Sequence, residues 1–524
     1  MPGVLLIAIT VLLVLVFGAV DASHYRSLSA ILSPDPVAAA GTLGLVGGAE
    51  GVTISIVIVV VVFGIQMTAT RYSPRIIGLF TRNFWNALVL GFSLASILYT
   101  FLVRSEIKPD YVPYWSLTAA EVLALVNFAI LLPYVGYIFE VMRAETLVAS
   151  IRRTAGREVG AAARGTNLHR HRAAMLISTT QITDIAFGAV QLGDMPVCLM
   201  TIDALRLFLT DEYLPLKKNF PDDWFRVGHT ELPGASDQIL AETNRARTWL
   251  EYTVMAGFVD IVGLTPAYRR EAVHAIAQAT RDIGTSAIEA GDHEVAELCL
   301  RFLNTYLRTA LHKDSPSFAS ATMNEYRRLA IEALEWRPDL AVEAAIHLLH
   351  YGHAFDEAEM PAILGAAAED VADLAISAVH RDSEVTRRLA RLLVQDLAAM
   401  LPRARPIGLN GVFKAVVKLA LWAMAEGHDE VAAILVTGIA QSPTEFVEAA
   451  LHRMEALKSG LFWEVNERVI AFDWVEERLR HEIPQLRRAL ANPLAAEVQE
   501  EHPQVTGPVE GEDLVQPAKL ARRR

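Results

Sequence analysis

Four long apolar runs dominate the first 142 residues of the chain. They cover about residues 4–20, 51–67, 87–103 and 117–139. The second run has no charged residue, and its 17 positions, at about 1.5 Å of helix per residue, span roughly the thickness of a bilayer's hydrocarbon core. The pattern therefore predicts a transmembrane region, residues 1–142, with four spans.

The first run has two interpretations. Val20-Asp21-Ala22 resembles the cleavage site of a signal peptide, but the leader Met1-Pro2-Gly3 lacks the positive charges that such a peptide carries. We favour a retained membrane helix. Cleavage leaves the later spans in the same orientation.

The arginines between the runs are distributed asymmetrically. Three follow the second run within residues 68–86, and seven lie within 143–172. The loops 21–40 and 104–115 carry only one and two basic residues. Because basic loops stay on the cytoplasmic side, we expect a multi-pass inner-membrane protein with a cytoplasmic C-terminal domain.

From residue 143 onward the pattern is that of amphipathic helices. Residues 143–236 read as a basic juxtamembrane segment, a helical motif and a connector. Residues 237–491 predict a cytoplasmic α-helical domain, an irregular stack of helical hairpins, with turns at Gly291, Gly352 and Gly427. The tail, 492–524, is rich in Pro, Glu and Gln and is expected to be disordered. The expected fold class is all-α.

Composition narrows the functional classes. The net charge of −13 argues against a nucleic-acid-binding protein, which needs a basic face. The two cysteines, Cys198 and Cys299, are far apart in the sequence, so neither a disulfide framework nor a cysteine zinc site is predicted.

Histidines at helical spacing are the weak candidates for a metal site. His347, His350 and His353 follow Glu343 at intervals that zinc ligands use on a helix. His353 follows a glycine, as other histidines of this chain do at turns, so we expect a turn preference and no bound metal or cofactor. The sequence contains neither a phosphate-binding loop nor a nucleophile elbow, and we identify no catalytic residue.

Few polar residues fall inside the predicted spans. Glu50, Glu121 and Glu140 lie near predicted membrane boundaries, and we expect them to be solvated. Asn127 is the one polar residue that we expect deep in a span. Gly47 and Gly51 form a G-x-x-x-G pair that suits either close helix packing or a loop at the membrane edge.

Two motifs resemble a known family. The first consists of residues around the second and third runs: Gly51, Ser55, Gln66, Ser73-Pro74-Arg75, Phe80, Arg82, Leu90-Gly91 and Tyr99. The second consists of Asp184-Ile185-Ala186-Phe187-Gly188, with Gln191-Leu192 and Asp194. Over about residues 42–210 the chain resembles the predicted bacterial membrane proteins called domain of unknown function 2254. The family's β-rich segment and its S-P-G-x-N-D-P motif are missing. The resemblance implies an integral membrane protein and no particular activity.

Ser73-Pro74-Arg75 is predicted to be a hinge after the second span. Pro74 has no N–H for a helical hydrogen bond and disfavours helical geometry at Ser73. Arg75 and Arg82 would then lie at the lipid headgroups. The alternative is that Arg75 contacts a ligand or phosphate.

These patterns predict a membrane-anchored interaction or scaffold protein. Its expected partners are the lipid bilayer and either another protein or further copies of the chain. A channel or transporter formed by oligomerised four-span bundles is the alternative, and a membrane-bound enzyme comes third.

Overall fold

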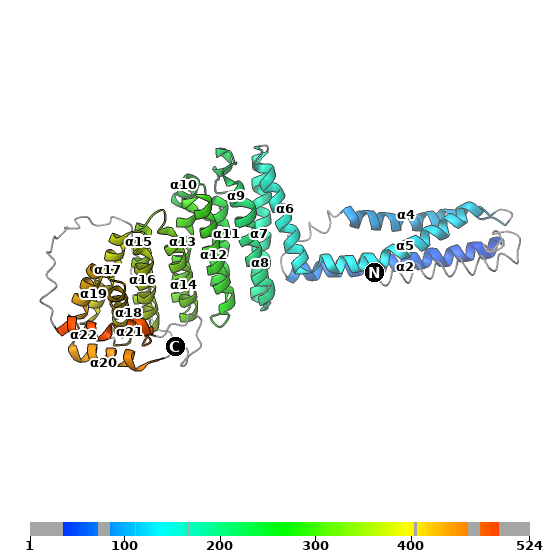
Figure 1. Cartoon of the computed structure of the whole chain (residues 1–524). Coiled ribbons are helices and arrows are strands. Elements are labelled where there is room, and N and C mark those ends of the chain that lie inside the picture. Colours follow the sequence, from blue (N-terminus) through cyan, green and yellow to red (C-terminus); the bar gives the residue numbers. More distant parts are fainter. Residues whose placement is uncertain are drawn as a thin grey trace, which may run out of the picture.

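The computed structural model describes residues 35–71, 84–109, 112–165, 167–402, 406–458 and 472–491. These residues form helices and connecting turns, with no strand among them. A slender helical bundle projects from one end of a broad stack of helices (Figure 1). The prediction of an all-α protein with a membrane region is confirmed. The first predicted span, 4–20, and the tail, 492–524, lie outside the described residues.

In the described part of the chain the bundle consists of α2 (Pro36–Arg71), α4 (Phe84–Glu106) and α5 (Tyr114–Val141). Each of the three is long and apolar enough to cross a membrane. Large apolar side chains point outward, among them Val59 and Phe101, each 67% exposed. Such a surface suits lipid, where the helical backbone already satisfies its own hydrogen bonds.

Helix α2 begins at Pro36, well before the second apolar run at 51–67. The small residues that precede this run are therefore part of the helix. Gly47 lies on the face toward α4, where a Cβ atom would be 3.3 Å from Cγ2 of Thr100. The missing side chain therefore brings α2 close to α4, while Gly51 faces nothing within 4 Å.

Two small apolar clusters hold the bundle together. One joins Leu43 of α2 to Val103 of α4 and Leu117 of α5. The other joins Val57 of α2 to Val89 of α4, and Leu131 and Tyr134 of α5 belong to it as well. The clusters lie toward opposite ends of the bundle, so the residues between them occupy its middle.

The stack continues the chain from residue 144. Its helices are α6 (Ala144–Ala162), α7 (Leu168–Leu192), α8 (Met195–Leu207), π-helix η3 (Phe208–Tyr213), α9 (Leu214–Lys217), 3₁₀-helix η4 (Asp222–Phe225), α10 (Asp237–Ala246), α11 (Trp249–Leu264), α12 (Arg270–Ala290), α13 (His293–His312), α14 (Pro316–Ala333), α15 (Asp339–Glu357), α16 (Ala362–Ala378), α17 (Ser383–Met400), α18 (Pro406–Ala425), α19 (Asp429–Ile439), α20 (Thr444–Ala456), α21 (Glu477–Arg480) and α22 (Ile483–Ala491).

Successive long helices alternate between two layers. Helices α7, α11, α13, α15 and α17 pack side by side in one layer, and α8, α12, α14, α16 and α18 in the other. One hydrophobic core runs between the layers. This is the stack of helical hairpins that the sequence predicts.

Two of the three turns predicted at glycines lie at helix ends, and the third does not. Gly291 and Gly427 end their helices with φ of 71° and 75°, and Asp292 caps the next helix by accepting the Val295 N–H at 3.4 Å. The predicted turn at Gly352 is wrong, because α15 continues to Glu357. Gly352 instead gives α16 room, since a Cβ there would lie 3.0 Å from the Cβ of Ala367.

Two helices of the stack also have the length and composition of a membrane span. In α7 half of the apolar window is buried inside the protein, and in α18 the share is 72%, against 17% in α2. Protein neighbours thus cover much of α7 and α18, which we interpret as core helices of the stack.

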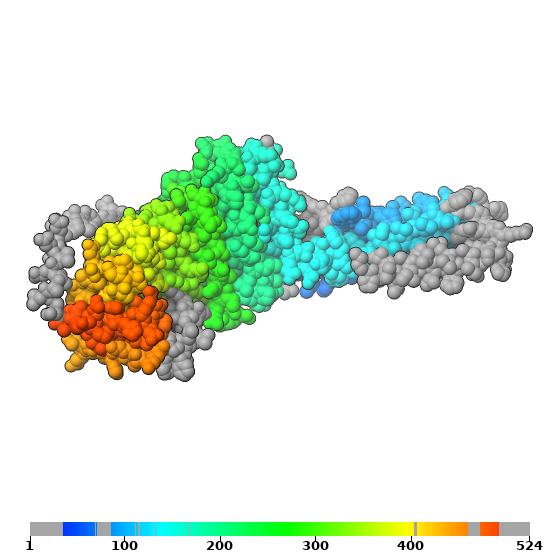
Figure 2. Space-filling model, in the orientation of Figure 1, coloured from blue at the N-terminus to red at the C-terminus, as the bar shows by residue number. Residues whose placement is uncertain are grey.

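Helix α6 lies at the end of the stack from which the bundle projects (Figures 1 and 2). It packs on α7 and α8 through buried residues that include Ile151 and Val159. Its exposed positions include Arg153 and Arg157. Arginine side chains are therefore concentrated where the stack meets the bundle.

Candidate functional site

A groove with two lobes runs over α11, and we call it the α11 groove. One lobe lies between α7, α11 and the loop 231–235 and measures about 750 Å³; we call it the motif lobe. The other, the α13 lobe, lies between α10, α11 and α13 and measures about 550 Å³. Tyr252, Ala256 and Asp260 of α11 line both lobes, so the two lobes adjoin along one face of this helix.

The motif lobe contains the second sequence motif. Asp184, Phe187 and Gly188 of α7 line it, together with Thr70 from the end of α2. The site therefore joins the stack to the end of a bundle helix. Thr70 comes three residues before Ser73.

Five residues of the first motif lie outside the described residues, namely Ser73, Pro74, Arg75, Phe80 and Arg82. The predicted hinge at Ser73-Pro74-Arg75 and the headgroup contacts of Arg75 and Arg82 therefore stay predictions.

Close packing of two helices forms the floor of the motif lobe. Gly257 of α11 faces Thr183 of α7, and a Cβ at this glycine would lie 2.8 Å from Thr183 Cγ2. The glycine thus lets α11 approach α7, and the polar and aromatic side chains of both helices line the space above. Thr180, Thr183 and Thr253 add hydroxyl groups to this lining.

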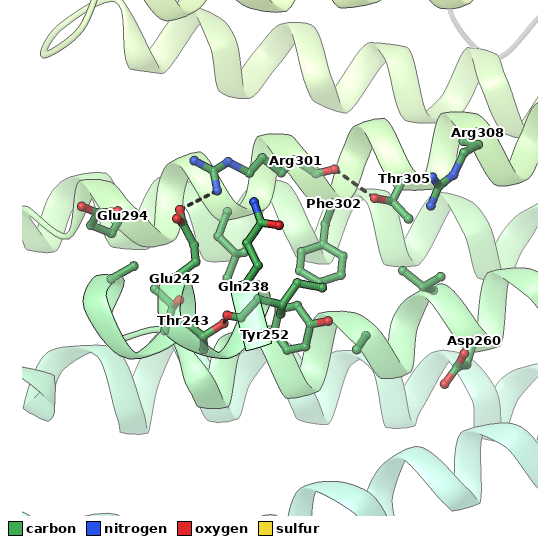
Figure 3. A pocket seen from close by; sticks show the side chains of 16 residues that line it. Gln238, Glu242, Thr243, Tyr252, Asp260, Glu294, Arg301, Phe302, Thr305 and Arg308 are labelled. Atoms are coloured by element: carbon green, nitrogen blue, oxygen red, sulfur yellow. Dashed lines mark hydrogen bonds and ion pairs between the residues drawn. The ribbon is translucent and has the colours of Figure 1, made fainter. Parts of the chain in front are cut away.

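The α13 lobe has aromatic and charged walls (Figure 3). The rings of Tyr252 and Phe302 meet edge to face with centroids 5.6 Å apart. Beside them Arg301 Nη1 donates to Glu242 Oε1 at 2.9 Å. Asp260 and Arg308 lie at the end of the lobe opposite Glu242.

Carboxylates outnumber cations along the groove. The acidic lining residues are Asp184, Glu231, Glu242, Asp260 and Glu294, and the basic ones are Arg301 and Arg308. Partial burial raises the pKa of Asp260. The hydrogen bond from Arg301 lowers the pKa of Glu242, which already has a cationic partner. The described lining of the motif lobe includes no lysine or arginine, so its charged lining groups are carboxylates.

A buried ion network fixes the helices beneath the groove. Lys217 Nζ lies 2.6 Å from Glu251 Oε1 and 2.7 Å from Asp292 Oδ2. Burial raises the pKa of Glu251 despite the attraction of Lys217. At Lys217 burial favours the neutral amine, but the two carboxylates outweigh it and raise the pKa. The network ties α9 to α11 and to the turn before α13.

The predicted metal candidates do not converge. His347 and His350 are exposed on α15, and burial of part of the ring lowers the pKa of His347. His353 Nε2 lies 2.5 Å from Asp396 Oδ1 of α17, which gives this ring a carboxylate partner. Within the described ranges no three His, Cys, Asp or Glu side chains form a group that could hold a metal ion.

The groove residues from α11 and α13 were not predicted from the sequence. One signal was present: Asp260 is an acidic residue in the otherwise uncharged run 252–264. Arg301 and Phe302 gave no such signal, because their spacing is ordinary for an amphipathic helix. Among the described lining residues there is no serine, cysteine or histidine.

Comparisons with known proteins bear on the first part of the chain. No curated protein matches the sequence. One solved structure, a "Circular tandem repeat protein with novel repeat topology and enhanced subunit contact surfaces", aligns at 15% identity with 78% of this chain and 98% of its own. Its TM-score of 0.31 is too low to carry an argument about fold or function. Residues 1–195 match the family described as "Predicted membrane protein (DUF2254)", which confirms the resemblance that the two motifs indicated.

Proposed function

We propose that this membrane protein is a membrane-anchored interaction protein. In this proposal the bundle holds the helical stack at the cytoplasmic face of the inner membrane. The α11 groove then binds a segment of a protein partner that combines lysine or arginine with apolar side chains. The observation that carries the proposal is that Asp184, Phe187 and Gly188 line one groove with Thr70 at the end of α2.

The arginines that follow the bundle support the orientation of the stack relative to the membrane. The basic stretch 143–172 begins directly after the bundle, and its exposed members include Arg153 and Arg157 of α6. Basic segments next to membrane helices remain in the cytoplasm and are attracted to anionic lipid. This supports a stack that lies on the cytoplasmic side, with α6 nearest the headgroups.

The chemistry of the partner follows from the lining of the groove. Carboxylates attract cationic side chains and speed their encounter. The rings of Phe187, Tyr252 and Phe302 provide apolar contact and faces on which a guanidinium stacks. A segment with both kinds of side chain fits these features better than an acidic or a wholly apolar one.

A peptide titration tests this proposal. The full chain in nanodiscs of neutral lipid is titrated with a labelled peptide of arginine and leucine, and with a matched peptide in which glutamate replaces arginine. We expect the arginine peptide to bind at least about tenfold more tightly, a difference of roughly 1.4 kcal/mol.

The matched variants separate the groove from general charge. Asp184→Asn with Asp260→Asn is expected to remove most of the preference for the arginine peptide. Asp429→Asn with Glu445→Gln removes two exposed charges on α19 and α20 and is expected to leave it unchanged. Equal binding by both double variants would show that the groove is not the site.

A second function, transport or conduction by oligomerised bundles, is favoured by one observation. Glu50 is fully buried inside the bundle, where a membrane protein rarely keeps an acidic residue without a functional reason. Sodium flux into proteoliposomes that Glu50→Gln abolishes would support this function, and flux equal to that of empty liposomes would reject it.

A further inference from the structure

A layer of polar side chains lies between the helices of the bundle. Its members are Glu50 of α2, Ser93, Ser96 and Thr100 of α4, and Asn127 of α5, and none is more than 1% exposed. The expectation that Glu50 is solvated near a membrane boundary is therefore wrong. Because α2 starts at Pro36, Glu50 falls well inside the helix instead of at its beginning.

The layer is connected by hydrogen bonds. Ser96 Oγ donates to Glu50 Oε1 at 2.7 Å, and Asn127 Nδ2 donates to the same oxygen at 2.9 Å. Thr100 Oγ1 donates to Glu50 Oε2 at 3.4 Å, and Ser93 Oγ donates to Asn127 Oδ1 at 2.6 Å. Each of α2, α4 and α5 thus contributes polar groups to the surroundings of one carboxylate.

The layer lies near the middle of the bundle. Asn127 is at the centre of α5 (Tyr114–Val141), and Ser93 and Ser96 flank the centre of α4 (Phe84–Glu106). The two apolar clusters of the bundle lie on either side along its axis. Both membrane interfaces are therefore distant from the carboxylate.

Within the described part of the bundle, Glu50 has hydrogen-bond donors but no cationic partner. Arg104 is close to Gly44, six residues before Glu50 and so roughly 9 Å away along the helix axis. An uncompensated charge at the centre of a membrane costs several kcal/mol or more, and hydrogen bonds offset only part of this cost. A positive species at the carboxylate removes the cost.

The available ligand atoms select the kind of cation. The layer offers two carboxylate oxygens, one amide oxygen and three hydroxyl oxygens, and it contains no sulfur or imidazole ligand. Oxygen sets of this kind suit hard cations, whereas transition metals favour nitrogen or sulfur. One carboxylate balances a single positive charge, and a divalent ion would leave a net charge in the membrane.

We propose that Glu50, Asn127 and the hydroxyl groups of Ser93, Ser96 and Thr100 form a binding site for a monovalent alkali cation inside the membrane bundle. In the structure Asn127 Nδ2 faces Glu50, so cation binding requires this amide to turn until Oδ1 faces the ion. Three helices contribute to the site, so an ion bound there stabilises their association. The site is separate from the α11 groove, and neither proposal depends on the other.

Thermal unfolding of the full chain in nanodiscs of neutral lipid tests the site. The probes are sodium chloride, potassium chloride and choline chloride at equal ionic strength. We expect sodium or potassium to raise the melting temperature above that in choline, with a dependence on concentration that follows binding to the native state. Glu50→Gln is expected to remove this difference.

Two further variants keep the test decisive if Glu50→Gln does not fold. Ser96→Ala retains the charge and removes one ligand oxygen, so we expect the apparent cation affinity to fall about tenfold, or roughly 1.4 kcal/mol. Glu121→Gln changes a partly exposed carboxylate of α5 and is expected to respond to sodium like the parent. The proposal is overturned if the parent chain melts at the same temperature in all three salts. It is also overturned if acid stabilises the parent chain and the alkali cations do not.

Discussion

Gly411 of α18 lies against the backbone of Gly365 of α16. A Cβ atom at Gly411 would be 2.6 Å from the Cα of Gly365, a distance that no packed structure tolerates. The two helices therefore touch along their backbones, and the pair of glycines sets how closely the last hairpins of the stack pack.

Replacing Gly411 by alanine tests this contact. The new methyl group would overlap backbone atoms, and no rotamer change can relieve this overlap. We therefore expect the free energy of unfolding to fall by roughly 1–3 kcal/mol. Denaturation of the full chain in detergent measures it. The matched control is Gly263→Ala in α11, where a Cβ meets nothing within 4 Å and φ is not positive. There we expect a gain of up to about 1 kcal/mol from helix propensity. Equal effects at both positions would contradict the packing argument.

Local patterns predicted the helices of this protein better than its sites. Apolar periodicity depends on neighbours within a few turns, so the hairpin stack could be predicted. The start of α2 was missed because residues 37–50, rich in Gly and Ala, resemble a loop, whereas their small size serves helix packing at Gly47. That error placed Glu50 at a boundary and hid the polar layer. The α11 groove combines residues from Thr70 to Arg308, and no local signal connects them.

The buried Lys217–Glu251 pair is expected to be costly to break. Lys217→Met leaves two carboxylates near each other without their cation, and we expect a loss of about 3–5 kcal/mol. Adding Glu251→Leu removes one of these carboxylates and should restore part of the stability. A double-mutant cycle measured by urea denaturation checks this. A double variant as unstable as the sum of the two single variants would show that the pair is not coupled.

Glu251 also predicts how stability depends on pH. Burial raises its pKa in the folded protein above the unfolded value, so the folded chain binds this proton more readily. Between these two pKa values stability from this group grows as pH falls and declines as pH rises. Glu251→Gln removes the proton site. The stability of the parent should therefore rise relative to that of the variant as the solution is acidified. Melting temperatures of both proteins across that range give the comparison, and a constant difference would argue against the shift.

Topology can be tested with reporters on the full chain. The arginine asymmetry predicts that a reporter active only in the cytoplasm works when fused after Arg524. A reporter active only in the periplasm is expected to work when placed near Pro34. The reverse pattern would invert the orientation and place the α11 groove on the outside.

The exposed arginines of α6 are expected to hold the stack at an anionic membrane. Arg153 and Arg157 lie on a helix whose opposite face packs on α7 and α8, at the end of the stack from which the bundle projects. Each basic residue near an anionic surface contributes about 1 kcal/mol. Hydrogen exchange of α6 should therefore be slower in nanodiscs with anionic lipid than in neutral ones.

The double variant Arg153→Glu with Arg157→Glu should remove this difference, because carboxylates are repelled by the same headgroups. The control Arg391→Glu reverses a half-exposed charge on α17, far along the stack from α6, and should preserve the difference. High salt should weaken the protection in the parent, since the attraction is electrostatic and screened. Protection of α6 that ignores lipid charge would mean that the bundle alone positions the stack.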